Sequence, residues 1–432
     1  MLNKSKISSL LHNKTIRNGG LFSIFSFFQK GVAFLLMIVL ARYITPEEYG
    51  ELSLFNTCVM FLGYIVGLST AGYLSVAYFK SDKEDFKKDF TSICTITVVV
   101  LLIIALLFIT FHNQLAELLK IPVPFLYIGV AVSFFHVFVN LNLDYLRIQE
   151  KVSKYGLLSC LFALIMSALT LCFVIGAGQN WAGRVYADLI TSILFGLIAV
   201  VCFVKQKLFD FNIDWPRCKV VILWGLPIIP HLASAWIKLG LDRYIVEYSH
   251  TMADVGIFSF AMSLTSIMVM VGTAFNQTNS VNLYQTLSSN LSKEDKLRRL
   301  RRKEKYISLS YLLVAVVTII FVSLMVPLFM PNYTASIPYV FILTIYGFFR
   351  CIYFLYCNYL FYYSKTKNLM YITFGTSILH LVLSLLFTRY SLFYTCAIYV
   401  ISEIAICVFT YSQSKKLSLI HISEPTRRSY IS

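Results

Sequence analysis

Long apolar runs alternate with short polar segments along this chain, and that alternation limits the possible folds more than any other feature. A run of about twenty apolar residues is long enough to cross a bilayer as an α-helix. Only 13% of the 432 residues are charged, compared with about 25% in soluble domains. The sequence therefore predicts an all-α membrane protein with twelve spans. We place them at residues 19–43, 53–78, 91–112, 121–143, 155–177, 183–204, 219–240, 255–280, 306–329, 335–361, 368–388 and 391–412.

Lysine and arginine concentrate in every second loop, with the largest cluster between Lys293 and Lys305. The intervening loops hold few basic residues, among which we count Arg184 and Lys238 at the ends of their spans. Cytoplasmic loops carry the basic excess, so both termini are expected in the cytoplasm. The formal net charge of +16 is then a topology signal, with no nucleic-acid partner expected. The cluster could also contact anionic lipid headgroups.

Short motifs recur in the two halves of the chain. Arg42-Tyr-Ile in the first half matches Arg243-Tyr-Ile in the second, and twelve residues before these motifs lie Lys30 and His231. Six spans in each half give both copies the same orientation, so the axis relating them would lie along the membrane normal. Chance similarity of short motifs is the alternative. The repeat predicts two six-helix bundles related by a pseudo-two-fold axis.

These bundles give a provisional domain map. A cytoplasmic N-terminal segment, 1–18, precedes the first bundle, 19–204. A cytoplasmic linker, 205–218, leads to the second bundle, 219–416. The remaining residues, 417–432, look like the translation of a sequencing adapter and are interpreted as non-native. The alternative is a genuine short cytoplasmic tail.

Two stretches of the sequence resemble a known family. One is Trp224-Gly-Leu-Pro-Ile-Ile-Pro-His231, followed by Leu241-Asp-Arg-Tyr-Ile245; the other joins Lys30-Gly31 and Leu40-Ala-Arg42 to Pro46-Glu-Glu-Tyr-Gly50. Both are similar to the Wzx-type polysaccharide flippases, which share a superfamily with the MATE drug exporters. The similarity covers residues 10–416.

The resemblance implies a transporter in the bacterial cytoplasmic (inner) membrane. Its substrate would be an undecaprenyl-pyrophosphate-linked oligosaccharide repeat unit for O-antigen, lipopolysaccharide or capsule assembly. The substrate would move by alternating access through a cationic central cleft. The implied partners are this lipid-linked glycan, membrane lipids, and the polymerase and chain-length proteins of the same pathway. No cofactor is implied.

Basic and polar side chains inside the spans are the candidate binding groups. A charge at the bilayer centre costs about 2.5–3.5 kcal/mol on insertion scales, so such residues generally face a polar path or a partner. Lys30 and Arg350 could hold the pyrophosphate. His231 follows two prolines that should bend or break the seventh helix, and His136 shares a helix face with Asn140. Internal ion pairs and ordinary helix packing are the alternatives.

Acidic residues could couple transport to an ion gradient. Asp188 and Glu403 lie in the last span of each half and could carry protons. The favoured alternative is that they simply pair with Lys30 or Arg350. Asp242 and Arg243, near the outer interface, are gate candidates whose alternative is a local cap or pair. His380 has apolar neighbours, which favours a packing role.

Two other functions fit a multi-pass protein. A MATE-type ion-coupled drug exporter should prefer acidic groups along its path, whereas the set here is mostly basic. A membrane polysaccharide polymerase or acyltransferase usually carries a large outer loop, and every outer loop here is short. Nucleotide-binding, zinc and nucleophile–base motifs are missing from the sequence. A transporter without metal or cofactor is therefore the favoured interpretation over an enzyme.

Overall fold

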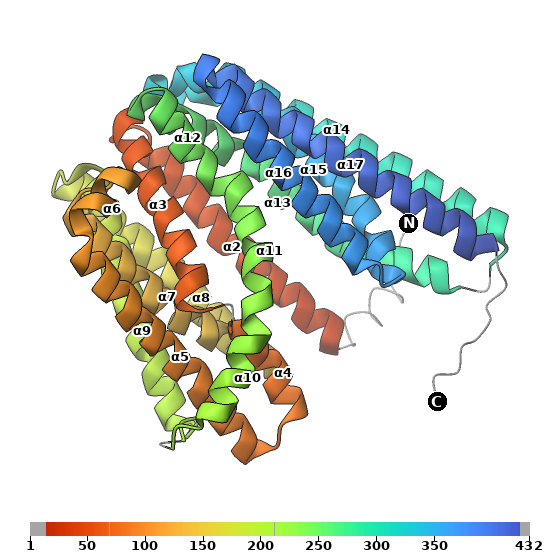
Figure 1. Cartoon of the computed structure of the whole chain (residues 1–432). Helices are drawn as coiled ribbons and strands as arrows, with labels where there is room; N and C mark the ends of the chain where they lie inside the picture. The colour runs from red at the N-terminus through yellow and green to blue at the C-terminus, as the bar shows by residue number, and fades with distance from the viewer. Residues whose placement is uncertain (1–13, 69, 211, 290, 424–432) are drawn as a thin grey trace. The chain divides into compact units, whose positions relative to one another are not determined.

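The computed structural model describes residues 14–68, 70–210, 212–289 and 291–423, which are almost entirely helical (Figure 1). No β-strand occurs within these ranges. Eleven of their helices are long and apolar enough to cross a membrane. The predicted all-α membrane fold is confirmed.

The helices follow the predicted spans closely in most of the chain. The first half contains α2 (Lys14–Leu40), α3 (Pro46–Val66), α4 (Ala71–Lys80), α5 (Lys83–Thr110), α6 (His112–Leu119), α7 (Val123–Ile148), α8 (Val152–Leu171), the π-helix η1 (Cys172–Gly176) and α9 (Asn180–Lys205). A run of short elements follows: α10 (Trp215–Gly225), η2 (Leu226–Ile228), α11 (Ile229–Trp236), η3 (Ile237–Leu241) and α12 (Asp242–Ser249). The rest comprises α13 (Met252–Ser288), α14 (Lys293–Phe329), η4 (Pro331–Ser336), α15 (Ile337–Tyr362), α16 (Thr366–Phe387), η5 (Thr388–Tyr390) and α17 (Leu392–Ser423).

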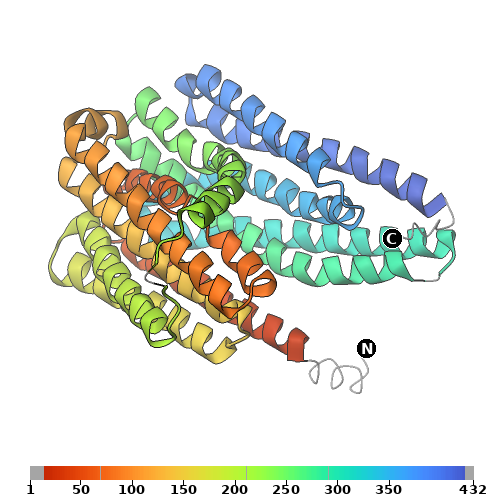
Figure 2. The same cartoon turned by 60° about the horizontal axis from the view of Figure 1, so that its bottom comes forward.

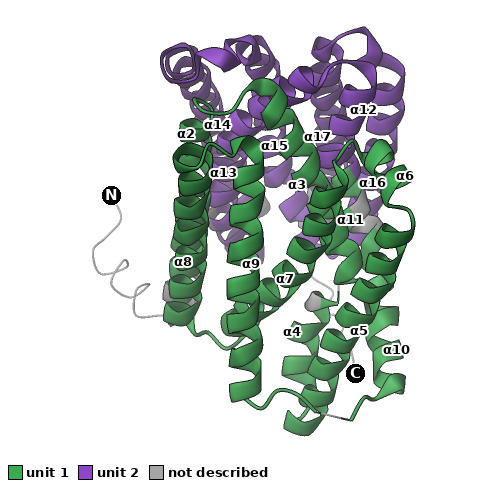
Figure 3. Ribbon diagram, turned by 90° about the vertical axis from the view of Figure 1, so that its left-hand side faces the viewer, with its two compact units in different colours: residues 1–236 green, residues 237–432 purple. Residues whose placement is uncertain are grey.

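The chain divides into two compact units, residues 1–236 and 237–432 (Figure 3). In unit 1, α7 packs against α3 and α9, and α2 packs against α8. In unit 2, α15 is central and packs against α13, α14 and α17, while α13 and α14 lie side by side (Figure 2). The observed boundary falls after α11, whereas the sequence placed a linker at 205–218. The predicted pseudo-symmetric bundles stay a prediction.

Two predicted spans are interrupted. The span expected at 53–78 is divided between α3 and α4, and Gly67 forms the C-cap of α3. A Cβ atom at Gly225 of α10 would collide with the carbonyl oxygen of Leu68. Glycine therefore permits α10 to approach the backbone of this break closely.

The seventh predicted span, 219–240, is the second interruption. It corresponds to α10, η2, α11 and η3, of which η2 is a 3-10 helix and η3 a π-helix. Pro227 lies in η2, as expected for a residue that cannot donate a helical hydrogen bond. Each piece is shorter than a membrane span, so the count of twelve spans stays a prediction.

Matching helix caps occur in the two halves of the chain. Thr45 and Glu48 form a capping box at the start of α3, and Thr251 with Asp254 forms the same box at the start of α13. Such boxes satisfy backbone N–H groups that have no partner within the helix. The tripeptide Lys-Glu-Asp also occurs in both halves and opens α5 at Lys83 and α14 at Lys293, directly after their N-caps. Capping chemistry at helix starts is therefore shared by the two halves.

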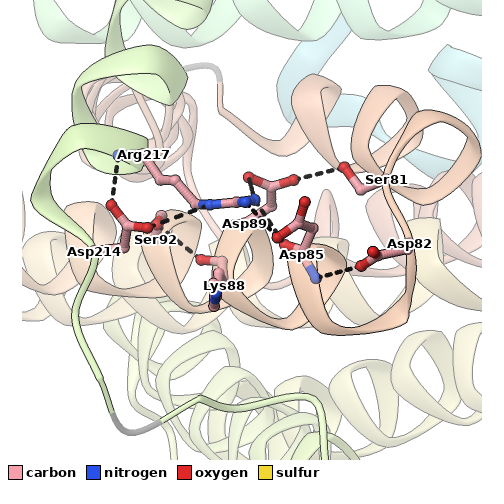
Figure 4. A network of polar contacts seen from close by, with 8 residues as sticks. All are labelled: Ser81, Asp82, Asp85, Lys88, Asp89, Ser92, Asp214 and Arg217. Carbon is pink, nitrogen blue, oxygen red and sulfur yellow. Dashed lines mark hydrogen bonds and ion pairs between the residues drawn. The ribbon is translucent and has the colours of Figure 1, made fainter.

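Arg217 of α10 forms ion pairs with residues of α5 in unit 1 (Figure 4). The guanidinium of Arg217 donates to the carboxylate of Asp85, lies 3.3 Å from Asp89 Oδ1 and 3.3 Å from Asp214 Oδ2. Ser81 donates to the second oxygen of Asp89 at 2.9 Å. Burial acts to lower the pKa of Arg217, but the charges of Asp89 and Asp85 raise it above its ordinary value. The network holds the start of α10 in unit 1.

Candidate functional site

Unit 2 contains one carboxylate held between two cations inside its helices. Glu403 of α17 places Oε1 3.1 Å from Nη1 of Arg350 in α15, and Oε2 3.6 Å from Nζ of Lys238 in η3. The side chain of Glu403 is 2% exposed and that of Lys238 13%. Buried charges are normally paired, because an unpaired one is costly. The charge of Asp242 in α12 also acts on Lys238, so two cations and two carboxylates lie close together here.

Arg350 is the accessible member of this cluster. Its side chain is 33% exposed, and its guanidinium carbon lies 5.2 Å from the ring centre of Tyr353 and 5.6 Å from that of Phe354. Within the described residues, Glu403 is the acceptor that Arg350 contacts. Guanidinium has five N–H donors, so Arg350 retains donors for an anionic ligand. Arg350 can therefore pair with Glu403, as the sequence suggested, and still bind an anionic ligand.

A second buried pair lies beside this cluster. Nε2 of His380 in α16 is 2.7 Å from Oδ2 of Asp242 in α12, and both side chains are almost fully buried. Nδ1 of His380 is 3.0 Å from the hydroxyl of Ser402. Tyr399 stacks edge-on against His380 and donates its hydroxyl to the carbonyl of Lys238. His380 thus has polar partners from two other helices. The sequence had favoured a packing role because the neighbours of His380 are apolar.

Arg243 does not pair with its neighbour Asp242 in the hydrogen bonds recorded for the described residues. Its Nε donates to the hydroxyl of Ser259 at 3.1 Å, and its Nη1 donates to the carbonyl of Leu239. The two gate candidates therefore have separate partners. Asp242 faces the interior of unit 2, and Arg243 connects α12 to α13.

Unit 1 contains a histidine–aspartate pair between α7 and α9. Nε2 of His136 is 3.1 Å from Oδ1 of Asp188, and their side chains are 29% and 8% exposed. The sequence singled out both residues but did not pair them with each other. The suggested pairing of Lys30 with Asp188 is wrong, because His136 occupies that carboxylate.

Lys30 and Asn140 are both exposed in unit 1. Within the described part of the chain, Lys30 has no hydrogen bond or ion pair. Asn140 lies one turn after His136 in α7, but only His136 contacts Asp188. The side chain of His231 lies outside the described residues, although its backbone belongs to α11. The structure thus leaves Lys30 as a cation available to a ligand.

Sequence reasoning missed one member of the site. Lys238 was counted with the outer loops, yet it lies in η3 and contacts Glu403. Its position four residues before Asp242 was a usable signal, since that spacing places both on one helix face. No group of three or more His, Cys, Asp or Glu side chains within the described residues could hold a metal ion.

The eleven apolar helices among the described residues define a multi-pass membrane protein. The chain is similar to the lipid II flippase MurJ in an inward closed conformation, at 16% identity and a TM-score of 0.71, with 93% of this chain and 91% of that chain covered. It is also similar to an inward-facing multidrug resistance MATE family transporter, at 14% identity and a TM-score of 0.69, with 91% and 94% covered. At these identities the likeness concerns the fold.

The sequence comparison gives the family. Residues 15–280 match the model of the polysaccharide biosynthesis protein family, and the chain belongs to that family. Protein 1 of the Lsg locus of Haemophilus influenzae is 21% identical over 433 aligned residues, covering 94% of this chain and 99% of that protein. The predicted family is confirmed.

Proposed function

We propose that this protein is a flippase that moves an undecaprenyl-pyrophosphate-linked oligosaccharide across the bacterial cytoplasmic membrane for surface polysaccharide assembly. The observation that carries the proposal is the Lys238–Glu403–Arg350 cluster, in which the guanidinium of Arg350 is partly exposed within apolar helices. A protein that only needed a stable interior would gain little from two cations around one carboxylate. A path for an anionic headgroup explains why the partly exposed guanidinium of Arg350 lies there.

Arg350 and Lys30 are the proposed contacts of the pyrophosphate. Arg350 offers a planar set of donors that can hold two phosphate oxygens, with two aromatic rings beside it. Lys30 is exposed, and no partner within the described residues neutralises it. His136, Asn140 and His231 remain secondary candidates for contacts with the headgroup.

Alternating access is the proposed mechanism, with the path open first to the cytoplasm and then to the outside. Glu403 holds Arg350 in place between transport events, and an arriving phosphate would compete for the same guanidinium. Asp188 and Glu403 are the proposed proton-coupling groups, since both are carboxylates buried within membrane helices beside a basic partner. Opening of the Asp242–His380 contact, together with movement of Arg243, is the proposed gate.

The test is export in a bacterial strain that lacks its own copy of this gene. Lys30→Gln and Arg350→Gln proteins that insert at wild-type levels should each lower surface polysaccharide by about tenfold or more, since a hydrogen bond to a charged group contributes about 1.5–3 kcal/mol. Arg389→Gln is the matched control, because Arg389 is exposed and contacts its neighbour Tyr390. Full export by both variants would refute the cationic path.

A MATE-type ion-coupled drug exporter is the second candidate. The buried carboxylates of Asp242 and Glu403 in unit 2 favour it, because ion-coupled transport needs groups that bind cations. Raised drug resistance on expression, with no change in surface polysaccharide when the gene is deleted, would support the exporter over the flippase.

A further inference from the structure

Unit 1 contains a cavity of about 260 Å³ between α2, α3, α8 and α9. Most of its wall is apolar, and its polar lining comes from five side chains, Gln29, Tyr49, Asn56, Ser167 and Arg184. Ligand pockets for whole drug-sized molecules measure about 300–1,000 Å³. The cavity is thus too small for an oligosaccharide and suits one compact group with a few attached carbons.

Among the described residues that line this cavity, Arg184 alone is charged. Its Nη1 atom is buried and has no hydrogen-bond partner within the described residues. Asp188 lies one helical turn further along α9 and its charge interacts with that of Arg184, but its hydrogen-bond partner is His136 at 3.1 Å. A buried charged donor without an acceptor is costly. Nη1 of Arg184 therefore lacks a hydrogen-bond acceptor within the described residues.

The remaining lining indicates what kind of acceptor fits. Leu36, Leu40, Leu52, Phe162 and Met166 form an apolar surface in the same cavity as Arg184. Guanidinium binds phosphate through two parallel hydrogen bonds, while the apolar wall suits a hydrocarbon chain. A ligand that joins both features is a phosphate group carrying an aliphatic chain.

The cavity lies behind helices whose outer faces suit lipid. Leu35 of α2 and Leu157 of α8 are more than 60% exposed, and α2 packs directly against α8. Apolar surfaces of this kind face lipid tails in a membrane protein. A chain attached to a phosphate in the cavity could continue into the bilayer without entering water.

We propose that Arg184 binds the phosphate of a lipid in this cavity, with the first carbons of the lipid chain against Phe162 and Met166. The inference rests on the proposed function in taking the lipid-linked substrate as the ligand, and an anionic phospholipid shares the same chemistry. Lys30 does not line the cavity, so Arg184 adds a binding residue to the set proposed from the sequence.

Binding to the purified full chain tests this inference without any transport step. Undecaprenyl pyrophosphate, phosphatidylglycerol and inorganic phosphate are offered separately, and bound ligand is measured by native mass spectrometry. Arg184→Gln should weaken lipid binding about tenfold to hundredfold, the equivalent of one lost charged hydrogen bond. Arg42→Gln removes the same charge from an exposed position outside the cavity and should bind as wild type.

The three probes show which phosphate-containing molecule binds in the cavity. Binding of undecaprenyl pyrophosphate that depends on Arg184 supports the substrate as ligand, and equal dependence with phosphatidylglycerol supports a membrane lipid. Binding of inorganic phosphate alone, or equal binding by Arg184→Gln and wild type, overturns the inference.

A second variant covers the possibility that Arg184→Gln does not fold. Ala163→Phe fills the cavity while leaving Arg184 in place, and it should also weaken lipid binding. Lipid binding that survives in Ala163→Phe would overturn the cavity as the site. If Lys30→Gln and Arg350→Gln lose export but Arg184→Gln binds lipid as wild type does, the Arg184 site is rejected and the proposed function is kept. If Lys30→Gln and Arg350→Gln export normally but Arg184→Gln loses lipid binding, the proposed function is rejected and the site is kept.

Discussion

Glu403→Gln perturbs the central cluster of unit 2 most directly. The substitution keeps the size of the side chain but removes the charge that holds Arg350 at 3.1 Å and Lys238 at 3.6 Å. At an effective dielectric constant of about 20, each contact is worth roughly 5 kcal/mol before desolvation is subtracted. Breaking a buried pair typically costs about 3–5 kcal/mol, so we expect a loss of that size in the free energy of unfolding.

The expected loss has a specific signature. In Glu403→Gln, the two cations repel each other across an uncharged amide. Adding Lys238→Met removes one of them, so the double variant should be more stable than Glu403→Gln alone. Glu117→Gln removes a carboxylate at an exposed position of α6 and should change stability by no more than about 0.5 kcal/mol.

The assay is reversible unfolding in mixed detergent micelles, with the free energy obtained from a denaturing-detergent titration of wild type, both single variants and the double variant. A double-mutant cycle then gives the coupling between the two positions. A Glu403→Gln protein within about 0.5 kcal/mol of wild type, with no coupling to Lys238, would refute the ion cluster.

Two further predictions concern the other charge networks and use the same assay. Arg217→Gln leaves the buried carboxylate of Asp89 without its guanidinium partner and should lower the free energy of unfolding by about 1.5–3 kcal/mol. The control Arg147→Gln removes a half-exposed ion pair and should cost at most about 1 kcal/mol. Equal losses in the two variants would contradict the Arg217 network. His380→Phe leaves Asp242 buried without its donor and should cost about 3–5 kcal/mol. Replacing Asp242 by Leu in the same protein should recover part of this loss, and no recovery would contradict the pairing.

Hydropathy was sufficient to locate most of the membrane helices, because apolar runs of the right length have few alternatives in a bilayer. It could not locate the break between α3 and α4, since the apolar run continues through Gly67 and Leu68. The position of such a break depends on a neighbouring element that packs against it, here α10, whose last residue Gly225 lies against the backbone of Leu68. The helix α17 also runs on to Ser423, into the segment interpreted as non-native.

The sequence predicted most of the residues of the candidate site, but fewer of the contacts between them. Glu403 was named as a partner for Arg350, and the structure contains that contact. The spacing of Lys238 and Asp242 could have placed Lys238 inside unit 2, but its contact with Glu403 joins residues from different helices, which spacing along the chain does not reveal. For the same reason the sequence offered Lys30 or Arg350 as partners of Asp188, whereas the structure pairs it with His136.

The central claim is that this protein carries a lipid-linked glycan across the membrane. The most direct measurement is the fraction of lipid-linked repeat units that a membrane-impermeant glycan-modifying reagent reaches from outside intact spheroplasts. We predict that this fraction falls to background when the gene is deleted, recovers with the wild-type protein, and stays low with the double variant Lys30→Gln, Arg350→Gln. Equal accessibility with and without the protein would contradict the claim.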